Sequence, residues 1–349
     1  MGQVLGLGIT HYPPYGLIDG HMANLLRWTL EDPDIPVEVK DIRAWPEAMR
    51  EEYGSDGGAA AAARHRQVLR AGFARVYDAL NAFNPDVVFI WGDDQYENYR
   101  EDVIPPFSVL AYEKAVFRPW DHDFGTPNVW DEPRDLEVSV PGHRDAAKYL
   151  TSALLDSGID MAYAYEPLHR GWGHAFANTV MFMDDERKGW PYPTVGIHIN
   201  CYGRKVVSAH GRPSRFAEDP ETAHLDPPSP SPSRCLEVGR AMGEALRDSP
   251  WRCAVIASSS WSHAFLTDKN WRLYPDMESD HAYYESLASG DFTRWHEAKL
   301  HQLEESGQQE MLNWFCLLGA VEALDLRATY TEYLDSHVFN SNKCFAIFE

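Results

Sequence analysis

Three of the 15 histidines stand where their side chains could take part in chemistry. His11 follows a short apolar run, and His263 follows another apolar run and three serines. His174 ends the segment GWGH, in which two glycines allow the backbone to approach another group closely. Three histidines and a carboxylate supply nitrogen and oxygen ligands without a thiolate, which suits non-haem Fe(II), with Mn(II) or Zn(II) as alternatives. These residues therefore indicate a metal centre.

Two acidic residues late in the chain are candidates for the carboxylate ligand. Glu310 opens the apolar segment 310–324, and Glu278 lies in the sequence DME. Acidic residues are also common at helix starts, because they complement the helix dipole. The residue pattern alone therefore leaves the choice between them open.

The candidate residues follow segments that have the character of buried strands. Residues 4–9, 86–91, 161–165 and 253–257 are runs rich in β-branched, aromatic or small apolar residues, and each stops at a polar cluster. In open α/β sheets, ligands bind at the carboxyl ends of the strands. We therefore expect these clusters to converge on one site.

Helical periodicity alternates with these strands. It is strongest over 58–83, and further helices are expected over 144–156 and 310–324. This alternation predicts an α/β fold. No internal repeat or low-complexity linker interrupts the chain, so we predict one catalytic domain spanning 1–349. Six prolines among polar residues predict a long surface loop over 212–233.

The remaining segments complete the expected layout. Residues 194–200 have the pattern of another buried strand, and 329–334 and 343–348 that of closing strands. Residues 292–303 are expected to form one helix. Prolines break up the region 100–143, which we expect to be mostly loop.

Charge and cysteine usage limit the partners and the compartment. The chain has 31 Lys and Arg against 53 Asp and Glu, a formal charge of -22, which disfavours nucleic acid and anionic membranes as partners. No apolar stretch approaches the ~18 residues of a membrane span, and the N-terminus lacks a signal-peptide pattern. Five scattered cysteines without a CxxC pair suggest neither disulfides nor a thiolate metal site, so we expect a cytoplasmic protein.

The order of these motifs resembles a known family. The chain carries GITH at 8–11, PDVV followed by an acidic loop at 85–88, and Gly-His at 173–174. It continues with an apolar strand and Ser-His at 254–263, and with GQQEMLNW at 307–314. Over nearly its whole length, the chain resembles the class III (LigB-type) extradiol ring-cleaving dioxygenases.

This resemblance implies an α/β fold with a central mixed β-sheet layer flanked by helices, and Fe(II) held by two histidines and one glutamate. His11 takes the position of the first histidine ligand. Glu310 takes that of the glutamate, because the family's glutamate precedes an Asn-Trp pair as it does here, with Glu278 as the fallback. His263 takes the position of the acid/base histidine beside the metal, and His174 that of a second histidine contacting substrate or oxygen.

The chain departs from the family at one ligand position. The family has an Asp-His pair whose histidine is the second iron ligand, but this chain reads GDDQY at 92–96. Aligning Asp94 with the family's aspartate puts Gln95 in the histidine position, and a shift of one residue puts Asp94 there. A glutamine carbonyl is a weak ligand, whereas an aspartate favours harder ions such as Mn(II). A neighbouring histidine could also replace the missing ligand, or the site could hold no metal.

The resemblance implies a non-haem Fe(II) extradiol dioxygenase that inserts both atoms of O2 into a catechol-type or hydroxylated aromatic substrate. The altered ligand position leaves two further functions open: a Zn- or Mn-dependent hydrolase or lyase, and a binding homologue that has lost catalysis. Aromatic or imidazole side chains next to site residues are candidates for the substrate pocket, namely Tyr12, His169, Trp172 and Trp261. The family often forms oligomers, in some cases with a small partner subunit, so a homo-oligomer or such a subunit is a further possibility.

Overall fold

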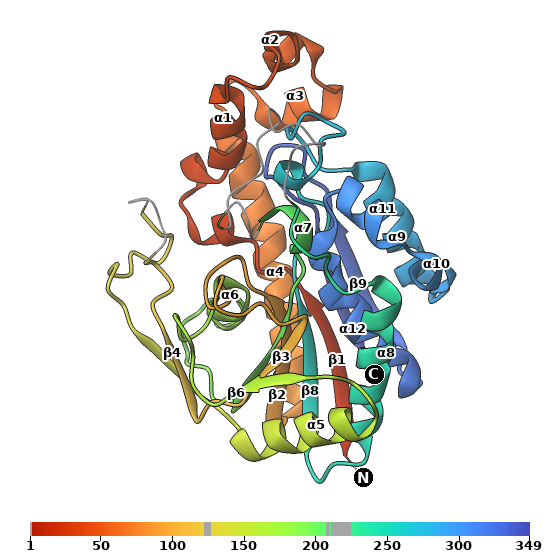
Figure 1. Ribbon diagram of the computed structural model, residues 1–349. Coiled ribbons are helices and arrows are strands. Elements are labelled where there is room, and N and C mark those ends of the chain that lie inside the picture. Colours follow the sequence, from red (N-terminus) through yellow and green to blue (C-terminus); the bar gives the residue numbers. More distant parts are fainter. Residues whose placement is uncertain (1, 122–126, 207–209, 211–224) are drawn as a thin grey trace.

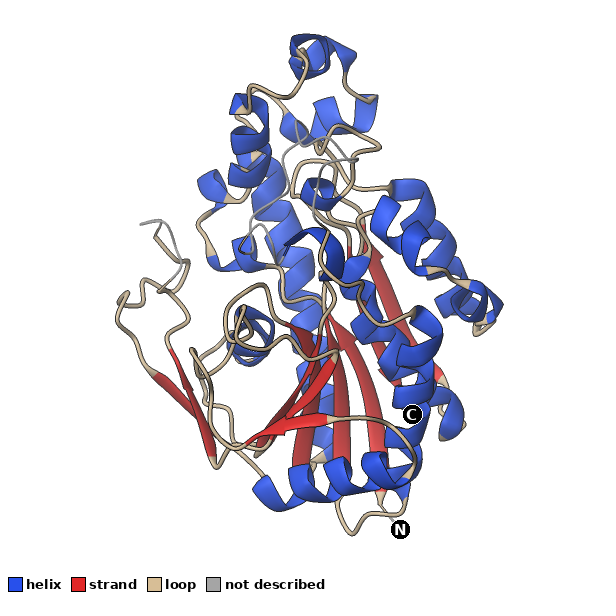
Figure 2. Ribbon diagram, viewed as in Figure 1, coloured by secondary structure: helices blue, strands red, loops and turns tan. Residues whose placement is uncertain are grey.

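An eight-stranded mixed sheet forms the centre of the computed structural model, which describes residues 2–121, 127–206, 210 and 225–349 (Figures 1 and 2). The strand order is β6-β3-β7-β2-β8-β1-β10-β9, and the four central strands β7, β2, β8 and β1 are parallel. β3 and β10 join this group antiparallel on either side. The strands are β1 (Gln3–Ile9), β2 (Val87–Asp93), β3 (Phe107–Leu110), β6 (Ala162–Ala164), β7 (Thr194–Ile199), β8 (Arg252–Ser258), β9 (Ala328–Leu334) and β10 (Lys343–Phe348).

Helices cover both faces of this sheet (Figure 1). Side chains alternate along β2, so that Val88 and Ile90 pack with α4 and α6, whereas Phe89 and Trp91 pack with α5, α8 and α12. Because both faces are covered, β2 is buried along its whole length and is almost continuously apolar. The helices are α1 (Asn24–Glu31), α2 (Val37–Lys40), α3 (Glu47–Tyr53), α4 (Ala59–Phe83), α5 (Arg144–Asp156), α6 (His174–Met183), α7 (Gly203–Val206), α8 (Pro232–Arg247), α9 (Met277–Ser289), α10 (Thr293–Glu297), α11 (Leu300–Glu305) and α12 (Leu312–Ala323).

The α/β fold with a central mixed sheet flanked by helices is therefore confirmed. The expected strands over 4–9, 86–91 and 253–257 correspond to the adjacent strands β1, β2 and β8. The expected strand over 161–165 shortens to β6 at the sheet edge. Among the helices within the described ranges, none is both long and apolar enough to cross a membrane.

One local expectation is incomplete and another is wrong. The described part of the region 100–143 is mostly loop, as expected, but it also contains β3 and the separate hairpin of β4 (Lys114–Phe117) and β5 (Val138–Pro141). These strands have four residues each, too few to show a clear alternation among the prolines. The helix expected over 292–303 is interrupted at Ala298, which adopts an extended backbone angle (ψ 139°) and separates α10 from α11.

Most of the proline-rich segment 212–233 lies outside the described residues. Its last two residues, Pro232 and Ser233, already belong to α8, which Ser231 caps by accepting a hydrogen bond from the Arg234 backbone N–H. The expectation of a long surface loop therefore stays a prediction, as does that of a single domain.

Gly8 in β1 is a position where the fold leaves no room for a side chain. A Cβ atom there would lie 2.1 Å from the indole ring of Trp314, which is fully buried on α12. We therefore expect Gly8→Ala to lower the free energy of unfolding by about 1–3 kcal/mol, measured by urea denaturation. The matched control is Gly20→Ala, since a Cβ at Gly20 has no neighbour within 4 Å. Equal stability of the two variants would show that Trp314 can move aside.

Candidate metal centre

The carboxyl ends of three adjacent parallel strands bring the candidate residues together. β8 lies between β1 and β2, so His11 just after β1 and Asp93 at the end of β2 reach the same edge of the sheet. Figure 1 shows this edge at the end of the sheet opposite the N-terminus, beneath α7. His174 begins α6 and Glu310 precedes α12, which pack on opposite faces of the sheet.

His11 has the protonation and orientation of a metal ligand. Its Nδ1 donates to the Ser258 carbonyl at 2.8 Å, which leaves the lone pair on Nε2. Nε2 lies 3.4 Å from Glu310 Oε2 and 3.9 Å from Asp93 Oδ1. Burial lowers the pKa of His11 well below its ordinary value, so the imidazole is neutral and its Nε2 can bind a metal.

Two buried carboxylates face the same space as His11. Glu310 Oε1 accepts a hydrogen bond from the Tyr202 hydroxyl, and Asp93 Oδ1 accepts one from Asn313 Nδ2 at 3.3 Å. The other oxygens, Glu310 Oε2 and Asp93 Oδ2, have no hydrogen-bond partner among the described residues. Burial raises the pKa of Asp93 to about 6, and burial together with Asp93 raises that of Glu310 well above its ordinary value.

These residues fit a divalent metal ion. His11, Asp93 and His174 each offer one ligand atom, and these atoms lie within 4.8 Å of one another. Buried carboxylate oxygens without a partner are energetically costly unless a cation neutralises them. A divalent ion at this place would satisfy both Asp93 and Glu310, and all its donor atoms would be nitrogen or oxygen.

His174 is held by a second acidic residue, Glu97. The carboxylate of Glu97 accepts from the His174 backbone N–H at 2.9 and 3.0 Å, and His174 Nδ1 lies 2.9 Å from Glu97 Oε2. A Cβ on Gly173 would lie 2.5 Å from the same oxygen, which explains the glycine before this histidine. Burial lowers the pKa of His174, but Glu97 outweighs burial and raises it to about 10.

His263 lies on the other side of Glu310. Its Nε2 is 3.3 Å from Glu310 Oε1, and its Nδ1 has no hydrogen-bond partner in the described structure. Its backbone N–H donates to the Gly307 carbonyl at 2.8 Å, which ties the His263 segment to the one that carries Glu310. Burial lowers the pKa of His263 to about 3, so the ring is a neutral imidazole that can accept a proton.

Asp280 on α9 supports the backbone next to His263. Its carboxylate accepts from the Ser262 backbone N–H at 2.9 Å, from Gln308 Nε2 at 2.6 Å and from Asn342 Nδ2 at 2.8 Å. Burial raises the pKa of Asp280 to about 7, while the three N–H donors act in the opposite direction. This buried carboxylate thus joins the Ser262-His263 segment to the segment just before Glu310.

We expect Asp280→Asn to lower the free energy of unfolding by about 1–3 kcal/mol, because the amide NH2 replaces an acceptor and leaves a buried N–H group unpaired. Thermal and urea denaturation measure this loss. Asp160→Asn, at an exposed position, is the control and should change stability by less than about 0.5 kcal/mol. A variant as stable as the control would mean that the three donors find other acceptors.

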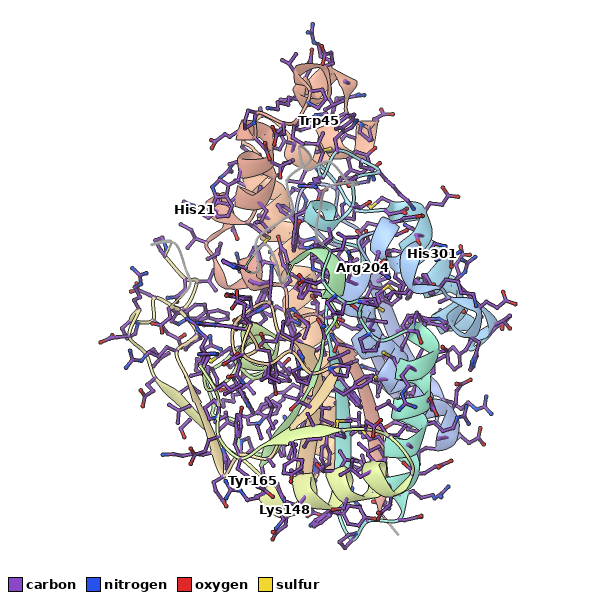
Figure 3. All side chains as sticks on the ribbon, viewed as in Figure 1. His21, Trp45, Lys148, Tyr165, Arg204 and His301 are labelled. Atoms are coloured by element: carbon purple, nitrogen blue, oxygen red, sulfur yellow. The ribbon has the colours of Figure 1, made fainter. Side chains whose placement is uncertain are left out.

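The structure brings most of the predicted site residues together but leaves one of them at the surface. His11, His174, His263 and Glu310 lie together, whereas the fallback Glu278 is exposed at the start of α9. Further histidines lie at the periphery, such as His21 and His301 near opposite edges of Figure 3.

The loop after β2 does not place the Asp94 carboxylate as a ligand. Asp94 accepts hydrogen bonds from the backbone N–H groups of Glu97, Asn98 and Tyr99 at 2.8 to 3.2 Å. Gln95 follows it as a half-buried residue. Asp93, the last residue of β2, faces the centre instead, and its place at the end of a buried strand was the available sequence signal.

Two contacting residues also escaped the sequence prediction. Tyr202, two residues before Arg204 in the sequence, contacts Glu310, and Glu97 contacts His174. They lie 108 and 77 residues from their partners, so no sequence spacing links them.

The predicted pocket residues have varied surroundings. Trp261 is fully buried against Trp295 and Trp314, and Tyr12 is buried with its hydroxyl donating to the Met22 carbonyl. His169 is exposed and lies 2.9 Å from Asp102. Trp172 stacks on Phe117 and lines a surface cavity of 240 Å³ together with other residues of the β4–β5 hairpin and the 170–172 segment.

Comparison with known proteins shows which family this chain resembles. Residues 223–346 match the family model described as the catalytic LigB subunit of aromatic ring-opening dioxygenase. A Photorhabdus laumondii protein named 2,3-dihydroxyphenylpropionate/2,3-dihydroxicinnamic acid 1,2-dioxygenase is 26% identical over 210 residues, 60% of this chain and 53% of that protein. Proteins of the same name from Rhodococcus sp and Burkholderia vietnamiensis are 28% and 26% identical, over 73% and 80% of this chain and 82% and 87% of theirs.

The match to the Photorhabdus relative thus spans about half of that protein's length, whereas the other two matches span most of theirs. The predicted resemblance is confirmed: the chain is related to the class III (LigB-type) extradiol dioxygenases.

Proposed function

We propose that the protein is a non-haem Fe(II) extradiol dioxygenase, which opens a catechol-type or hydroxylated aromatic ring and inserts both atoms of O2. One observation carries this proposal. His11 Nε2 lies 3.4 Å from the unpartnered Oε2 of Glu310 and 3.9 Å from Oδ1 of the buried Asp93, and His174 and His263 flank this cluster. The proposal thus combines a set of metal ligands with two histidines that are available for proton transfer.

The relatives are named for 2,3-dihydroxyphenylpropionate and 2,3-dihydroxicinnamic acid, which both carry two neighbouring ring hydroxyls. We therefore propose a vicinal dihydroxy aromatic as the substrate class, together with O2. The named compounds are the first substrates to test, followed by simpler catechols.

The protein residues would divide the work between metal binding and proton transfer. His11 and Glu310 would hold the metal, and Asp93 faces the same space. The electrons that reduce O2 come from the aromatic substrate, and Fe(II), when bound, would bring O2 and substrate together and allow this electron transfer, which no side chain can do. His263 Nε2, neutral because burial lowers its pKa, would take a proton from a substrate hydroxyl. His174, kept protonated by Glu97, would return a proton from Nε2 as the ring opens.

The direct test is anaerobic reconstitution with Fe(II), followed by a panel of catechols in the presence of O2. We expect oxygen uptake matched by a yellow ring-opened product. Parallel samples with Mn(II) and Zn(II) would identify the active metal. No turnover together with no bound iron would contradict the proposal.

A hydrolase or lyase that uses Zn(II) or Mn(II) is the second candidate. The observation that favours it is the Asp93 carboxylate at the centre, since carboxylate ligands favour harder ions than imidazoles do. Metal analysis of the protein as isolated separates the two: iron supports the dioxygenase, and zinc or manganese without oxygen uptake supports the hydrolase or lyase.

We further propose that residues 1–349 act as one catalytic domain in the cytoplasm. Two groups of buried apolar residues on the two faces of one sheet support the single domain. All five cysteines are buried and unpaired, which suits a reducing compartment. Size-exclusion chromatography with light scattering would distinguish a monomer from a homo-oligomer, and co-purification would detect a small partner subunit.

A further inference from the structure

The question left by the sequence is which residue replaces the family's second histidine ligand. The family's motif puts Asp94 or Gln95 at this position, but the Asp94 carboxylate is already hydrogen-bonded to backbone N–H groups of its own loop. Its Oδ1 accepts from Glu97 N at 2.8 Å and Tyr99 N at 3.2 Å, and its Oδ2 accepts from Asn98 N at 2.9 Å. Turning this carboxylate toward a metal would break all three bonds and release the loop that carries Glu97.

Asp93 has the opposite surroundings. Its side chain is fully buried, its Oδ1 lies 3.9 Å from His11 Nε2, and its Oδ2 has no hydrogen-bond partner among the described residues. Asn313 Nδ2 donates to Oδ1 at 3.3 Å, and Asn313 stands three positions after Glu310. Metal-binding carboxylates usually have such a hydrogen-bond donor, which fixes their orientation.

We propose that Asp93 is the third protein ligand of the metal, beside His11 and Glu310, in the place that the LigB-type family gives to a histidine. The proposal rests on the proposed function only in assuming that a divalent metal binds here. The proposal leaves His174, the remaining member of the cluster, in the proton-transfer role, with its Nδ1 held 2.9 Å from Glu97 Oε2.

This ligand set changes the charge of the centre. Two carboxylates and a neutral imidazole balance the two charges of a divalent ion, whereas two imidazoles and one carboxylate leave one positive charge. Carboxylate ligands also favour Mn(II) relative to Zn(II), which imidazole suits better. An Asp93→His variant, which restores the family's donor types, should therefore shift the preference from Mn(II) toward Zn(II).

Metal binding to the chelator-treated full chain tests the proposal without any assay of activity. Isothermal titration with Mn(II) gives the affinity, and the absorption spectrum of bound Co(II) reports the ligand set. We expect Asp93→Asn to weaken Mn(II) binding by at least about tenfold, the loss seen when even a supporting residue is removed. The matched control is Asp94→Asn, the same change at the adjacent buried carboxylate, and Gln95→Ala tests the other aligned position. Both should bind within about threefold of the wild type.

Thermal denaturation provides an independent readout that also reports folding. Without metal, Asp93→Asn should be at least as stable as the wild type, because it removes a buried carboxylate that has an unpartnered oxygen. Adding Mn(II) should then raise the melting temperature of the wild type and of Gln95→Ala, but not that of Asp93→Asn.

The outcomes separate this inference from the proposed function. If Asp93→Asn binds Mn(II) like the wild type, or if Gln95→Ala loses it instead, Asp93 is not the ligand, whether or not the wild type cleaves catechols. If Asp93→Asn alone loses the metal while no catechol is cleaved by the wild type, the ligand assignment stands and the dioxygenase proposal fails. If Asp93→Asn does not fold, an unchanged metal preference in Asp93→His would overturn the assignment.

Discussion

Replacing His263 by alanine should abolish turnover while leaving the metal content near that of the wild type. His263 Nε2 lies 3.3 Å from Glu310 Oε1, but His263 is not part of the cluster of ligand atoms that His11, Asp93 and His174 form. Loss of a positioned proton acceptor costs about 10²–10⁴-fold in rate. We expect the fall to appear in kcat, measured by oxygen uptake on the iron-loaded protein, with iron quantified in the same samples.

The control for this prediction is His281→Ala, which removes a half-exposed histidine that pairs with Asp335 at 3.0 Å, away from the centre. Its rate and iron content should match those of the wild type. If His263→Ala loses its iron together with its activity, His263 binds the metal and its role as a proton acceptor is wrong.

Replacing Glu310 by glutamine should remove most of the bound metal. The side chain is buried, Oε2 lies 3.4 Å from His11 Nε2, and Oε1 accepts from Tyr202. A neutral amide keeps the shape of the carboxylate but loses the charge that attracts a divalent ion, and its NH2 group would face a donor or the metal. We expect the metal content to fall to less than about a tenth of the wild-type value, measured by elemental analysis after dialysis.

The apo form of Glu310→Gln should nevertheless fold, because the change removes a buried negative charge. Circular dichroism checks this point and separates metal loss from unfolding. Glu278→Gln is the control, since Glu278 is the other acidic residue that the sequence offered and is exposed on α9. Metal loss in Glu278→Gln with retention in Glu310→Gln would reverse the assignment.

Glu310 links the two halves of the proposed chemistry. One oxygen faces His11 and the position proposed for the metal, and the other contacts both Tyr202 and His263. Any shift of this carboxylate would therefore move the proton acceptor and the metal ligand together. The Gly307 carbonyl and Asp280 hold the two chain segments in register, which keeps this geometry fixed.

Much of the fold was predictable from local patterns. The buried strands β1, β2 and β8 show apolar runs that end at polar residues, and the long helix α4 shows a clear periodicity. Strand ends determine where the side chains of His11 and Asp93 emerge, so the common edge of the sheet followed from the sequence. The four-residue strands β3, β4 and β5 were missed because their pairing depends on partners elsewhere in the chain.

The sequence by itself determined the α/β class, the edge of the sheet where the site lies and the histidines that meet there, and its resemblance to the LigB-type family singled out Glu310 rather than Glu278. Only the tertiary structure decided that Asp94 binds backbone N–H groups while Asp93 faces His11, because neighbouring residues at a strand end differ in orientation, not in type. It also decided the contacts of Glu97 with His174 and of Tyr202 with Glu310, which join distant segments. Such contacts follow from how helices and loops pack over the sheet, and no residue spacing records them.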